Sequence, residues 1–360
     1  MEKVGIVTIT ESYNYGNRLQ NYAMQTNIKK LGFKAETIRV NTKNISKVFQ
    51  LKFWTKNILN VNCSQYERRV YSFTKFNRKH IKFSKYSINS DEINHKISKY
   101  YDFFICGSDQ IWNPYFFFNS DNKFLSFVEH KKKIAVAASF GIEELPKEEE
   151  KHVADMLKDF SAISVREKAG KEIIEKLMDK LVCVLPDPTL TLAKTEWEKI
   201  EKKPKNIPKH YILSYLLGEY EIDIQKQINE YANIENVESI YLENEYQKEK
   251  KGKHDYYDAS PENFIWLIHH CDKVIADSFH AVVFALIFSK PFIVVSRPKE
   301  NGTGNMQSRF LQLQEMFDIK NMFVKNDDYS SCADVDFEKA HAVMRQEKER
   351  FIKFLKENLK

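Results

Sequence analysis

Apolar runs and helical segments alternate along the chain from its first residues. Residues 3–10 read KVGIVTIT and predict a strand. Residues 16–32 follow with apolar side chains at helical spacing and with Gly32 as a helix stop, and residues 35–40, AETIRV, predict the next strand. Strand, helix and strand in this order indicate an opening βαβ unit with parallel strands.

The same alternation continues toward the end of the chain, after one divergent stretch. Residues 41–100 are rich in Lys, Asn and Phe and predict helices and loops, as an insertion or connecting region. Further strands that end in polar turns are predicted at 101–109, 132–141, 161–167, 181–188, 211–218 and 237–242.

Residues 271–295, CDKVIADSFHAVVFALIFSKPFIVV, are strongly apolar but carry polar side chains near their middle. A membrane span needs about 20 apolar residues with few or no charges, and Asp277, His280 and Lys290 interrupt this stretch. The pattern predicts a strand, a turn, a buried helix, a turn and a strand. Asp277, Ser278 and His280 then lie where the strand ends and the helix begins, which is the edge where open α/β sheets bind ligands.

The predicted fold class is α/β, with two Rossmann-like domains facing a cleft. A chain of 360 residues exceeds one ordinary core, and the charged segment at 191–210 carries two prolines. We expect an N-terminal α/β domain at 1–190 and a C-terminal α/β domain at 208–336 that carries the DSFH motif. A helix at 337–360 is expected to pack back on the N-terminal domain. The ligand is expected between the carboxyl ends of the two sheets.

Composition excludes several classes of protein. Hydrophobic residues make up 42% and aromatic residues 13%, which is ample for packed cores, and ten glycines and nine prolines are too few for a collagen-like or linker-rich chain. The net charge of +6 arises from interleaved charges, which favours a solvated surface over nucleic-acid binding. Five scattered cysteines without a CxxC pair indicate a reduced, cytoplasmic protein. The start predicts a strand and not a signal peptide, and no window predicts a membrane span.

His280 is the strongest candidate for chemistry, because it falls in the first turn of the predicted apolar helix. The positive end of a helix attracts an anion. A bound phosphate would help His280 to hold a proton, as a general acid must. Asp277 and Ser278 have a structural alternative, since Asp or Ser before an apolar helix is a common N-cap.

Arg166, in SVREKAG, is a second candidate at the end of a predicted strand. An arginine at the end of a strand can bind a carboxylate or phosphate by donating two N–H groups to it. The alternative is a surface ion pair with a nearby Glu.

Polar residues also follow two other predicted strands, in SYNYGNRLQNYAMQ (12–25) and GSDQIWNP (107–114). Turn formation explains their Gly, Asn and Asp, but amide groups beside an aromatic ring also suit a sugar. The candidate substrate-binding residues here are Asn14, Tyr15, Gly16, Asn17, Gln20, Ser108, Asp109, Trp112 and Asn113. Tyr15 and Trp112 would be the rings on which a sugar stacks.

Other motifs carry less information. Arg309 lies in the first turns of a predicted helix after NGTGNMQS, whose single GxG is weak evidence for phosphate binding. The motifs GxxxxGK[ST], GxGxxG, HExxH and GxSxG do not occur. His269 and His270 end a predicted helix, where cap or core roles are favoured, so no metal site is predicted.

Taken together, these motifs resemble the polysaccharide pyruvyl transferase family. The matching pieces are NYGNRLQNYAMQ, FFICGSDQIWNP, AASFG, SVRE, the PDPT turn at 186–189, DSFHAVVFALIFSKPFI, and SRF ahead of LQEMFDI. They occur in the family's order and span nearly the whole chain. The set is specific for the family but not for a substrate.

The resemblance implies a glycosyltransferase-B-like fold and the transfer of pyruvate from phosphoenolpyruvate to a sugar hydroxyl pair, giving a cyclic ketal. The acceptor would be a bacterial cell-surface polysaccharide or its precursor. His280 matches the family's proposed general acid, and Arg166 matches an arginine that contacts the donor anion. Some members have Arg-Leu-His where this chain has Ser278 two residues before His280, so Arg297 or Arg309 would supply the missing cation.

The expected partners are phosphoenolpyruvate and a saccharide acceptor, with no cofactor and no metal. The expected location is the cytoplasm, and peripheral contact with the inner face of the membrane is compatible with a lipid-linked acceptor. One alternative is a nucleotide-sugar-dependent glycosyltransferase of the same fold, with a nucleoside diphosphate at a helix N-terminus. Another is a non-catalytic glycan-binding relative, against which the presence of His280 and Arg166 argues.

Overall fold

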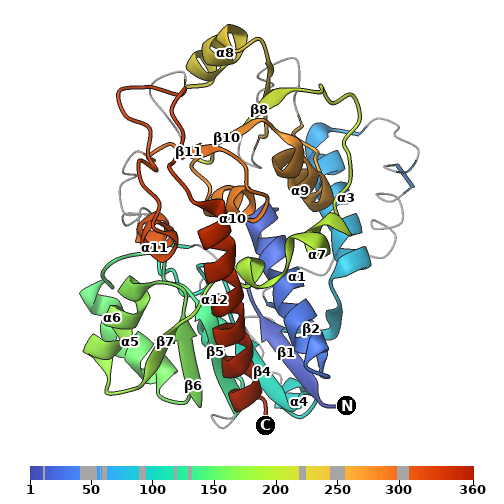
Figure 1. The fold of residues 1–360 in the computed structure, drawn as a ribbon. Coiled ribbons are helices and arrows are strands. Elements are labelled where there is room, and N and C mark those ends of the chain that lie inside the picture. The colour runs from blue at the N-terminus through green and yellow to red at the C-terminus, as the bar shows by residue number, and fades with distance from the viewer. Residues whose placement is uncertain are drawn as a thin grey trace.

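The computed structural model describes residues 1–10, 13–40, 55–56, 58, 63–88, 95–116, 120–128, 132–218, 224–243, 256–297 and 308–360. Two parallel sheets lie one above the other, and helices cover them (Figure 1). The predicted α/β fold with two parallel sheets is confirmed.

The first sheet has seven strands among the described residues, in the order β3-β2-β1-β4-β5-β6-β7. They are β1 (Lys3–Val7), β2 (Lys34–Val40), β3 (Phe83–Ile88), β4 (Phe103–Cys106), β5 (Lys133–Ala138), β6 (Ala162–Val165) and β7 (Val182–Val184). All neighbouring pairs are parallel. The strand order reverses between β1 and β4, and the carboxyl ends of such a pair form a ligand-binding crevice in open α/β sheets.

The helices and 3₁₀ helices of this half follow the predicted alternation. They are α1 (Tyr15–Lys30), α3 (Gln65–His80), α4 (His95–Ser98), η1 (Asp121–Phe124), α5 (Lys147–Leu157), α6 (Lys168–Leu177), η3 (Pro188–Thr191) and α7 (Lys194–Glu198). Gly32, the predicted stop of the first helix, has a φ of +91° just after the end of α1, a conformation that glycine adopts without strain. The prediction of only helices and loops for 41–100 is wrong over its described part, because β3 pairs with β2 there.

The second sheet has the order β11-β10-β8-β9. Its strands are β8 (Tyr211–Tyr215), β9 (Glu238–Tyr241), β10 (Lys273–Ala276) and β11 (Phe292–Val294), and its helices are α8 (Ile224–Ile234), α9 (Pro261–His270), α10 (Phe279–Ile287) and α11 (Ser308–Phe317). The predicted βαβ unit at 271–295 is confirmed as β10, α10 and β11. Every residue of α10 is buried, which explains why this helix is apolar on all sides.

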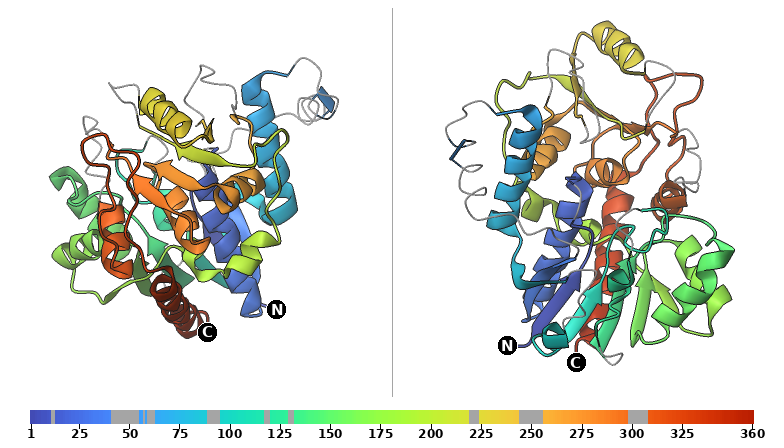
Figure 2. Two further views of the ribbon diagram at one scale, coloured as in Figure 1. Left: turned by 45° about the horizontal axis from the view of Figure 1, so that its top comes forward. Right: turned by 180° about the vertical axis from the view of Figure 1, so that it is seen from behind.

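The last helix, α12 (Phe337–Asn358), runs from the second sheet down along the first, as Figures 1 and 2 show. Its Phe351 and Leu355 are completely buried in one cluster with Val4 of β1 and Ile28 of α1. The helix therefore fastens the second half of the chain to the first.

A shared apolar core joins the two halves around α1, α3, α9 and α10. Tyr15 of α1 and Phe73 of α3 belong to the same buried cluster as Phe264 of α9 and Phe284 of α10. The ring of Tyr15 stacks on that of Phe264, with centroids 4.7 Å apart and planes 14° apart. This contact area is large and apolar, so it fixes the relative position of the two sheets.

A buried arginine completes this junction. Arg69 of α3 is 1% exposed, and its Nη1 donates to the carbonyl oxygens of Glu243 (3.2 Å) and Tyr257 (2.6 Å) in the second half. Its Nη2 donates to the carbonyl oxygen of Tyr13 (2.9 Å) in the first half. One guanidinium thus ties three backbone segments together.

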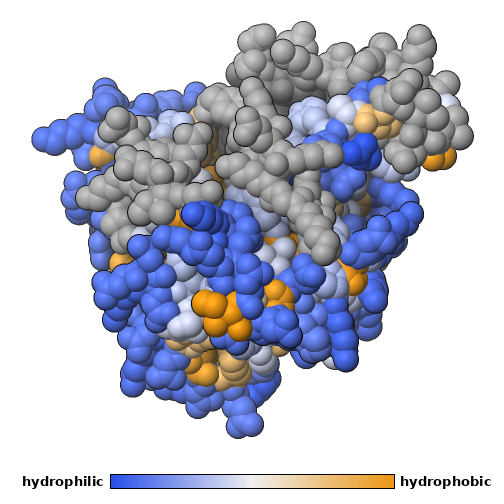
Figure 3. Space-filling view, turned by 90° about the horizontal axis from the view of Figure 1, so that it is seen from above, coloured by the Kyte–Doolittle hydropathy of each residue, from blue (hydrophilic) through white to orange (hydrophobic). Residues whose placement is uncertain are grey.

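Across the described part of the chain, none of the helices is both long and apolar enough to cross a bilayer. Seen from above, the described surface is mainly hydrophilic, with small separate hydrophobic groups (Figure 3).

We predict that Arg69→Met lowers the free energy of unfolding by about 3 kcal/mol or more, because each buried carbonyl left without a donor costs roughly 1–3 kcal/mol. Urea unfolding followed by circular dichroism measures the change. Arg78→Met, at an exposed position of the same helix, serves as the control and should change the value by less than about 0.5 kcal/mol. Equal unfolding midpoints for Arg69→Met and wild type would show that this junction does not depend on Arg69.

Candidate active site

Polar side chains converge where β4, β5, β6 and β7 end. Asp109, Ser139, Arg166 and Asp187 each follow one of these strands, and all four are buried. Carboxyl ends of parallel strands meet at one edge of a sheet, so the topology alone brings these residues together. Gly107 allows the close approach of the first turn to β5, because a Cβ on it would lie 2.2 Å from the carbonyl oxygen of Val136.

Asp187 is the centre of this group and is completely buried. Its Oδ1 accepts from the backbone N–H (3.0 Å) and the hydroxyl (2.7 Å) of Thr189. Its Oδ2 accepts from Arg166 Nη1 (3.1 Å) and Ser108 Oγ (3.4 Å). Burial alone would raise the pKa of Asp187, but His280, Arg166 and the Thr189 N–H outweigh burial and lower it. The carboxylate is therefore charged at neutral pH.

Arg166 is held by acids on one side. Its Nη1 is shared between Asp187 and Asp109 (3.3 Å), and its Nη2 donates to Ser139 Oγ (3.2 Å). Glu167 Oε2 lies 3.5 Å from its Nε. Burial alone would lower the pKa of Arg166, but Asp109, Glu167 and Asp187 outweigh burial and raise it. The predicted alternative, an ion pair with a nearby Glu, is present with Glu167, but it is buried and not at the surface, because the Arg166 side chain is 3% exposed.

His280 brings the second half of the chain to this cluster. It lies in the first turn of α10, as predicted, and its Nε2 is 3.5 Å from Asp187 Oδ2. The start of α1 packs on the other side of the ring, where a Cβ on Gly16 would lie 2.0 Å from Nδ1. Only glycine fits there, so Gly16 sets the position of the imidazole.

Asp277 points away from His280 and organises the second sheet instead. Its two carboxylate oxygens accept the backbone N–H groups of Leu217 and Gly218, both at 2.7 Å. Arg297 Nε donates to the same carboxylate at 2.9 Å. The N-cap position of α10 belongs to Ser278, whose side chain makes no capping hydrogen bond. The N-cap alternative for Asp277 is thus wrong.

Arg309, on α11, differs from the other arginines here. It is 7% exposed, its Nε has no hydrogen-bond partner, and no acidic group pairs with it among the described residues. Its Cζ lies 5.9 Å from the ring centroid of Phe279, and Arg166 lies 4.7 Å from the same centroid. Burial, together with the charges of Arg166 and Arg297, lowers the pKa of Arg309 to about 9, although Asp109 and Glu167 act in the opposite direction.

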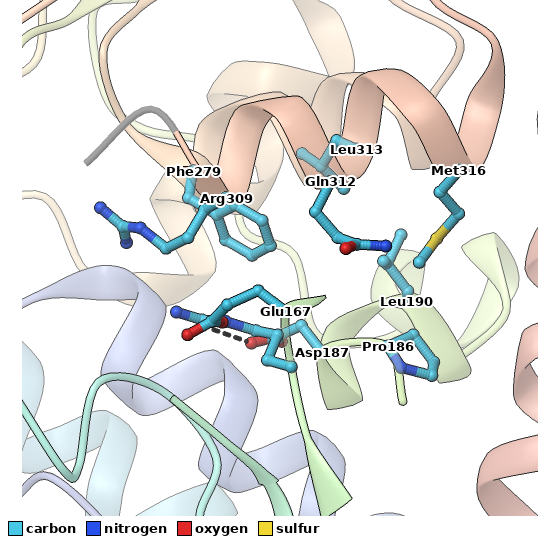
Figure 4. Close-up of a pocket in the computed structure, with 10 residues that line it drawn as sticks. Glu167, Pro186, Asp187, Leu190, Phe279, Arg309, Gln312, Leu313 and Met316 are labelled. Carbon is cyan, nitrogen blue, oxygen red and sulfur yellow. Dashed lines mark hydrogen bonds and ion pairs between the residues drawn. The ribbon is translucent and has the colours of Figure 1, made fainter. Parts of the chain in front are cut away.

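A small pocket lies between α11 and the strand ends of the first sheet (Figure 4). Its volume is about 10 Å³, room for about one water molecule. Arg309, Gln312, Leu313 and Met316 of α11 line it from above, and Arg166, Glu167, Pro186, Asp187, Leu190 and Phe279 complete the lining. The pocket therefore lies between Arg309, which forms no ion pair among the described residues, and the acidic cluster around Asp187.

Several predicted residues shape the turns around the cluster. Asn17 donates to Asp109, and Gln20 Oε1 accepts the Ser108 N–H at 3.3 Å. Asn14 caps α1 by accepting the Gly16 N–H at 2.8 Å. Asn113 accepts the Tyr115 N–H in its own turn, at 3.0 Å. The structure gives these residues a positioning role.

The two predicted sugar platforms require correction. Tyr15 is completely buried in the core between the two halves, and its hydroxyl donates to the carbonyl oxygen of Ala259. Trp112 is 1% exposed and stacks on Phe124, with its Nε1 donating to the Lys123 carbonyl oxygen. Tyr15 has no free face for a sugar, and Trp112 is almost wholly covered although it is among the residues that line a surface pocket of about 400 Å³.

Sequence reasoning did not single out Asp187, Glu167, Ser139, Phe279 or Gln312 as site residues. The PDPT turn contained a signal for Asp187, since an acid between two prolines directly after a strand is confined to the sheet's ligand edge. Among the described residues, His, Cys and carboxylate ligand atoms converge in a group of three at Glu201, His269 and His270, and not around Asp187.

Solved structures with the same fold cover nearly the whole chain at low sequence identity. The UDP-GlcNAc 2-epimerase of Methanocaldococcus jannaschii, in complex with UDP-GlcNAc and UDP, is 14% identical over 99% of both chains, with a TM-score of 0.52. The UDP-N-acetylglucosamine 2-epimerase of Rickettsia bellii is 10% identical over 99% of this chain and 98% of its own, with a TM-score of 0.51. At these identities the likeness shows the fold alone, which is the glycosyltransferase-B fold.

Comparison of the sequence with known proteins and with family models tests the family. A search of curated proteins gives no match. The family model described as polysaccharide pyruvyl transferase matches residues 14–298, from the N-cap of α1 to just beyond Arg297. Because that match spans well over half of the 360 residues, the chain belongs to the polysaccharide pyruvyl transferase family.

Proposed function

We propose that this protein transfers pyruvate from phosphoenolpyruvate to a pair of hydroxyl groups on a saccharide and forms a cyclic ketal. The observation that carries the proposal is the buried charge of Arg309, which forms no ion pair among the described residues and is offset only at longer range by Asp109 and Glu167. A buried cation without a partner costs several kcal/mol. An anionic ligand would remove this cost, so the site favours a negatively charged substrate.

Phosphoenolpyruvate carries two anionic groups, and two arginines lie near Phe279. Burial and then the charge of Arg166 lower the pKa of Arg309, so the two guanidinium groups repel each other. An anion between them would convert this repulsion into attraction to both. Arg297 donates hydrogen bonds to Asp277. Arg309 is therefore the better candidate for the cation that some family members carry at the position of Ser278.

The proposed reaction begins with a proton from His280. The proton adds to the methylene carbon of phosphoenolpyruvate and leaves an oxocarbenium-like centre at C2. One sugar hydroxyl adds to C2, the C2–O bond to phosphate breaks, and the second hydroxyl adds to C2 and closes the ring, giving the ketal and inorganic phosphate. Each hydroxyl releases one proton, of which one leaves with the phosphate and the other restores His280. An imidazolium at His280 would have the Asp187 carboxylate as its counter-charge at 3.5 Å.

Binding of the donor requires side chains of the pocket to move, because the present space holds about one water molecule. Gln312 and Met316 have long, unbranched side chains on α11 and line the pocket opposite Asp187. New rotamers of these two would widen it without movement of the sheet. The strand ends that carry Arg166 and Asp187 would stay in place.

We predict that Arg309→Met weakens phosphoenolpyruvate binding by about 2 kcal/mol or more, roughly 30-fold, because one partner of a buried charge pair is removed. Isothermal titration calorimetry with phosphoenolpyruvate measures the change. Arg350→Met is the matched control, since this arginine is exposed on α12 and pairs with Glu347, and its affinity should equal that of wild type. Unchanged affinity in Arg309→Met, or binding of UDP but not phosphoenolpyruvate by wild type, would contradict the proposed donor.

His280→Gln is expected to reduce turnover by about 10²–10⁴-fold, the usual contribution of a general acid, while phosphoenolpyruvate affinity changes little. Phosphate release in the presence of a saccharide acceptor measures turnover, and calorimetry measures binding. Near-normal turnover of this variant would exclude His280 as the proton donor.

Gly16→Ala is expected to lower turnover with little effect on donor affinity, because the added methyl group displaces the imidazole of His280. The same two measurements apply. Gly170→Ala, in helix α6, is the control, since its new methyl group would meet side chains at ordinary contact distances of 3.4 Å or more. If both variants behave like wild type, His280 does not depend on the close approach of α1.

A further inference from the structure

A second group of titratable side chains lies away from the pocket, where the segment after α7 meets the end of α9. Glu201 follows α7, and His269 and His270 are the last two residues of α9. His269 Nδ1 lies 2.9 Å from Glu201 Oε2, and His270 Nε2 lies 3.4 Å from Glu201 Oε1. One carboxylate therefore faces two imidazoles from a segment 68 residues away in sequence.

Both imidazole rings are held in place by aromatic neighbours. His269 stacks on Phe288, with centroids 4.2 Å apart and planes 17° apart. His270 stacks on Trp266, with centroids 4.3 Å apart and planes 20° apart. The side chains of His269 and Glu201 are 16% and 15% exposed, so the site is shielded yet reachable from solvent through His270, at 42%. Such preorganisation lowers the entropy cost of binding a ligand here.

The potential ligand atoms of these three side chains all lie within 4.8 Å of one another. A zinc ion binds imidazole nitrogen at about 2.0–2.1 Å and carboxylate oxygen at about 2.0–2.2 Å, so two ligands of one ion lie up to roughly 4 Å apart. Small side-chain rotations are thus sufficient to surround an ion. The backbone need not move.

The outer contacts of the group also match a metal site. His269 Nε2, the nitrogen that does not face Glu201, lies 3.8 Å from Glu198 Oε1. A carboxylate beside the second nitrogen of a ligating histidine fixes the ring's tautomer and raises its basicity. Glu198 is the last residue of α7, so this helix would contribute an orienting group, and Glu201, three residues further on, would contribute a ligand.

We propose that Glu201, His269 and His270 bind a divalent transition-metal ion of the zinc type. Two imidazoles and one carboxylate form a donor set that suits zinc and not magnesium, which prefers oxygen ligands. The ion would pin the connection between the two halves to the last turn of α9. This site is independent of the proposed donor pocket, because none of its ligands lines that pocket.

The test is a calorimetric titration of chelator-treated protein with zinc chloride, in a Cys332→Ser background that removes an exposed thiol. One ion should bind per chain, with micromolar or tighter affinity, and should raise the thermal midpoint. In the double variant His269→Gln/His270→Gln, affinity should fall by at least about 10-fold, and zinc should no longer raise the midpoint. Magnesium chloride should produce neither effect.

Matched controls separate this site from adventitious binding by surface histidines. His152 and His210 each lie beside an aspartate at the surface, and their Gln variants should bind zinc like the parent protein. Glu201→Gln keeps both imidazoles and the size of the side chain, so its zinc affinity tests the proposed site even if the double variant does not fold. Failure of the parent to bind one zinc, or equal binding by Glu201→Gln and the parent, would overturn the proposal.

Discussion

The arrangement of this site depends on the buried carboxylate of Asp187. Its η3 turn holds one oxygen with the N–H and hydroxyl of Thr189, while the other oxygen meets Arg166, Ser108 and His280. These contacts come from the ends of three strands of the first sheet and from α10 of the second half. A buried charge of this kind is tolerated only with several donors, so each donor is constrained by the others.

Arg166 and Arg309, the two arginines near Phe279, have different roles. Arg166 is neutralised by Asp109, Asp187 and Glu167 and keeps the acidic cluster in order. Arg309 forms no ion pair within the described part of the chain, and its charge is the one that we propose for binding a substrate anion. Arg297, which the sequence offered as an equal candidate, donates to Asp277 instead.

Much of the fold could be read from local patterns, because parallel buried strands and the apolar helix α10 have strong periodic signals. The positions of Arg166 and His280, at a strand end of the first sheet and at a helix start of the second, also placed them on two sides of one cleft before any contact was known. The roles of Tyr15 and Trp112 could not be predicted in this way. The sequence pattern of an aromatic residue beside amides is the same whether the ring is exposed or packed, as Tyr15 is on Phe264 and Trp112 on Phe124. The strand β3 was missed because FSKYSI is polar and only partly buried at the sheet's edge.

We propose that phosphoenolpyruvate binds in the space between Arg309 and the Asp187 cluster. A crystal structure of the protein soaked with phosphoenolpyruvate would show whether it does. The ligand should lie beside Phe279, with an anionic group within hydrogen-bond distance of the Arg309 guanidinium and its methylene carbon toward His280. Phosphoenolpyruvate bound elsewhere, with Arg309 making no contact to it, would exclude this donor site.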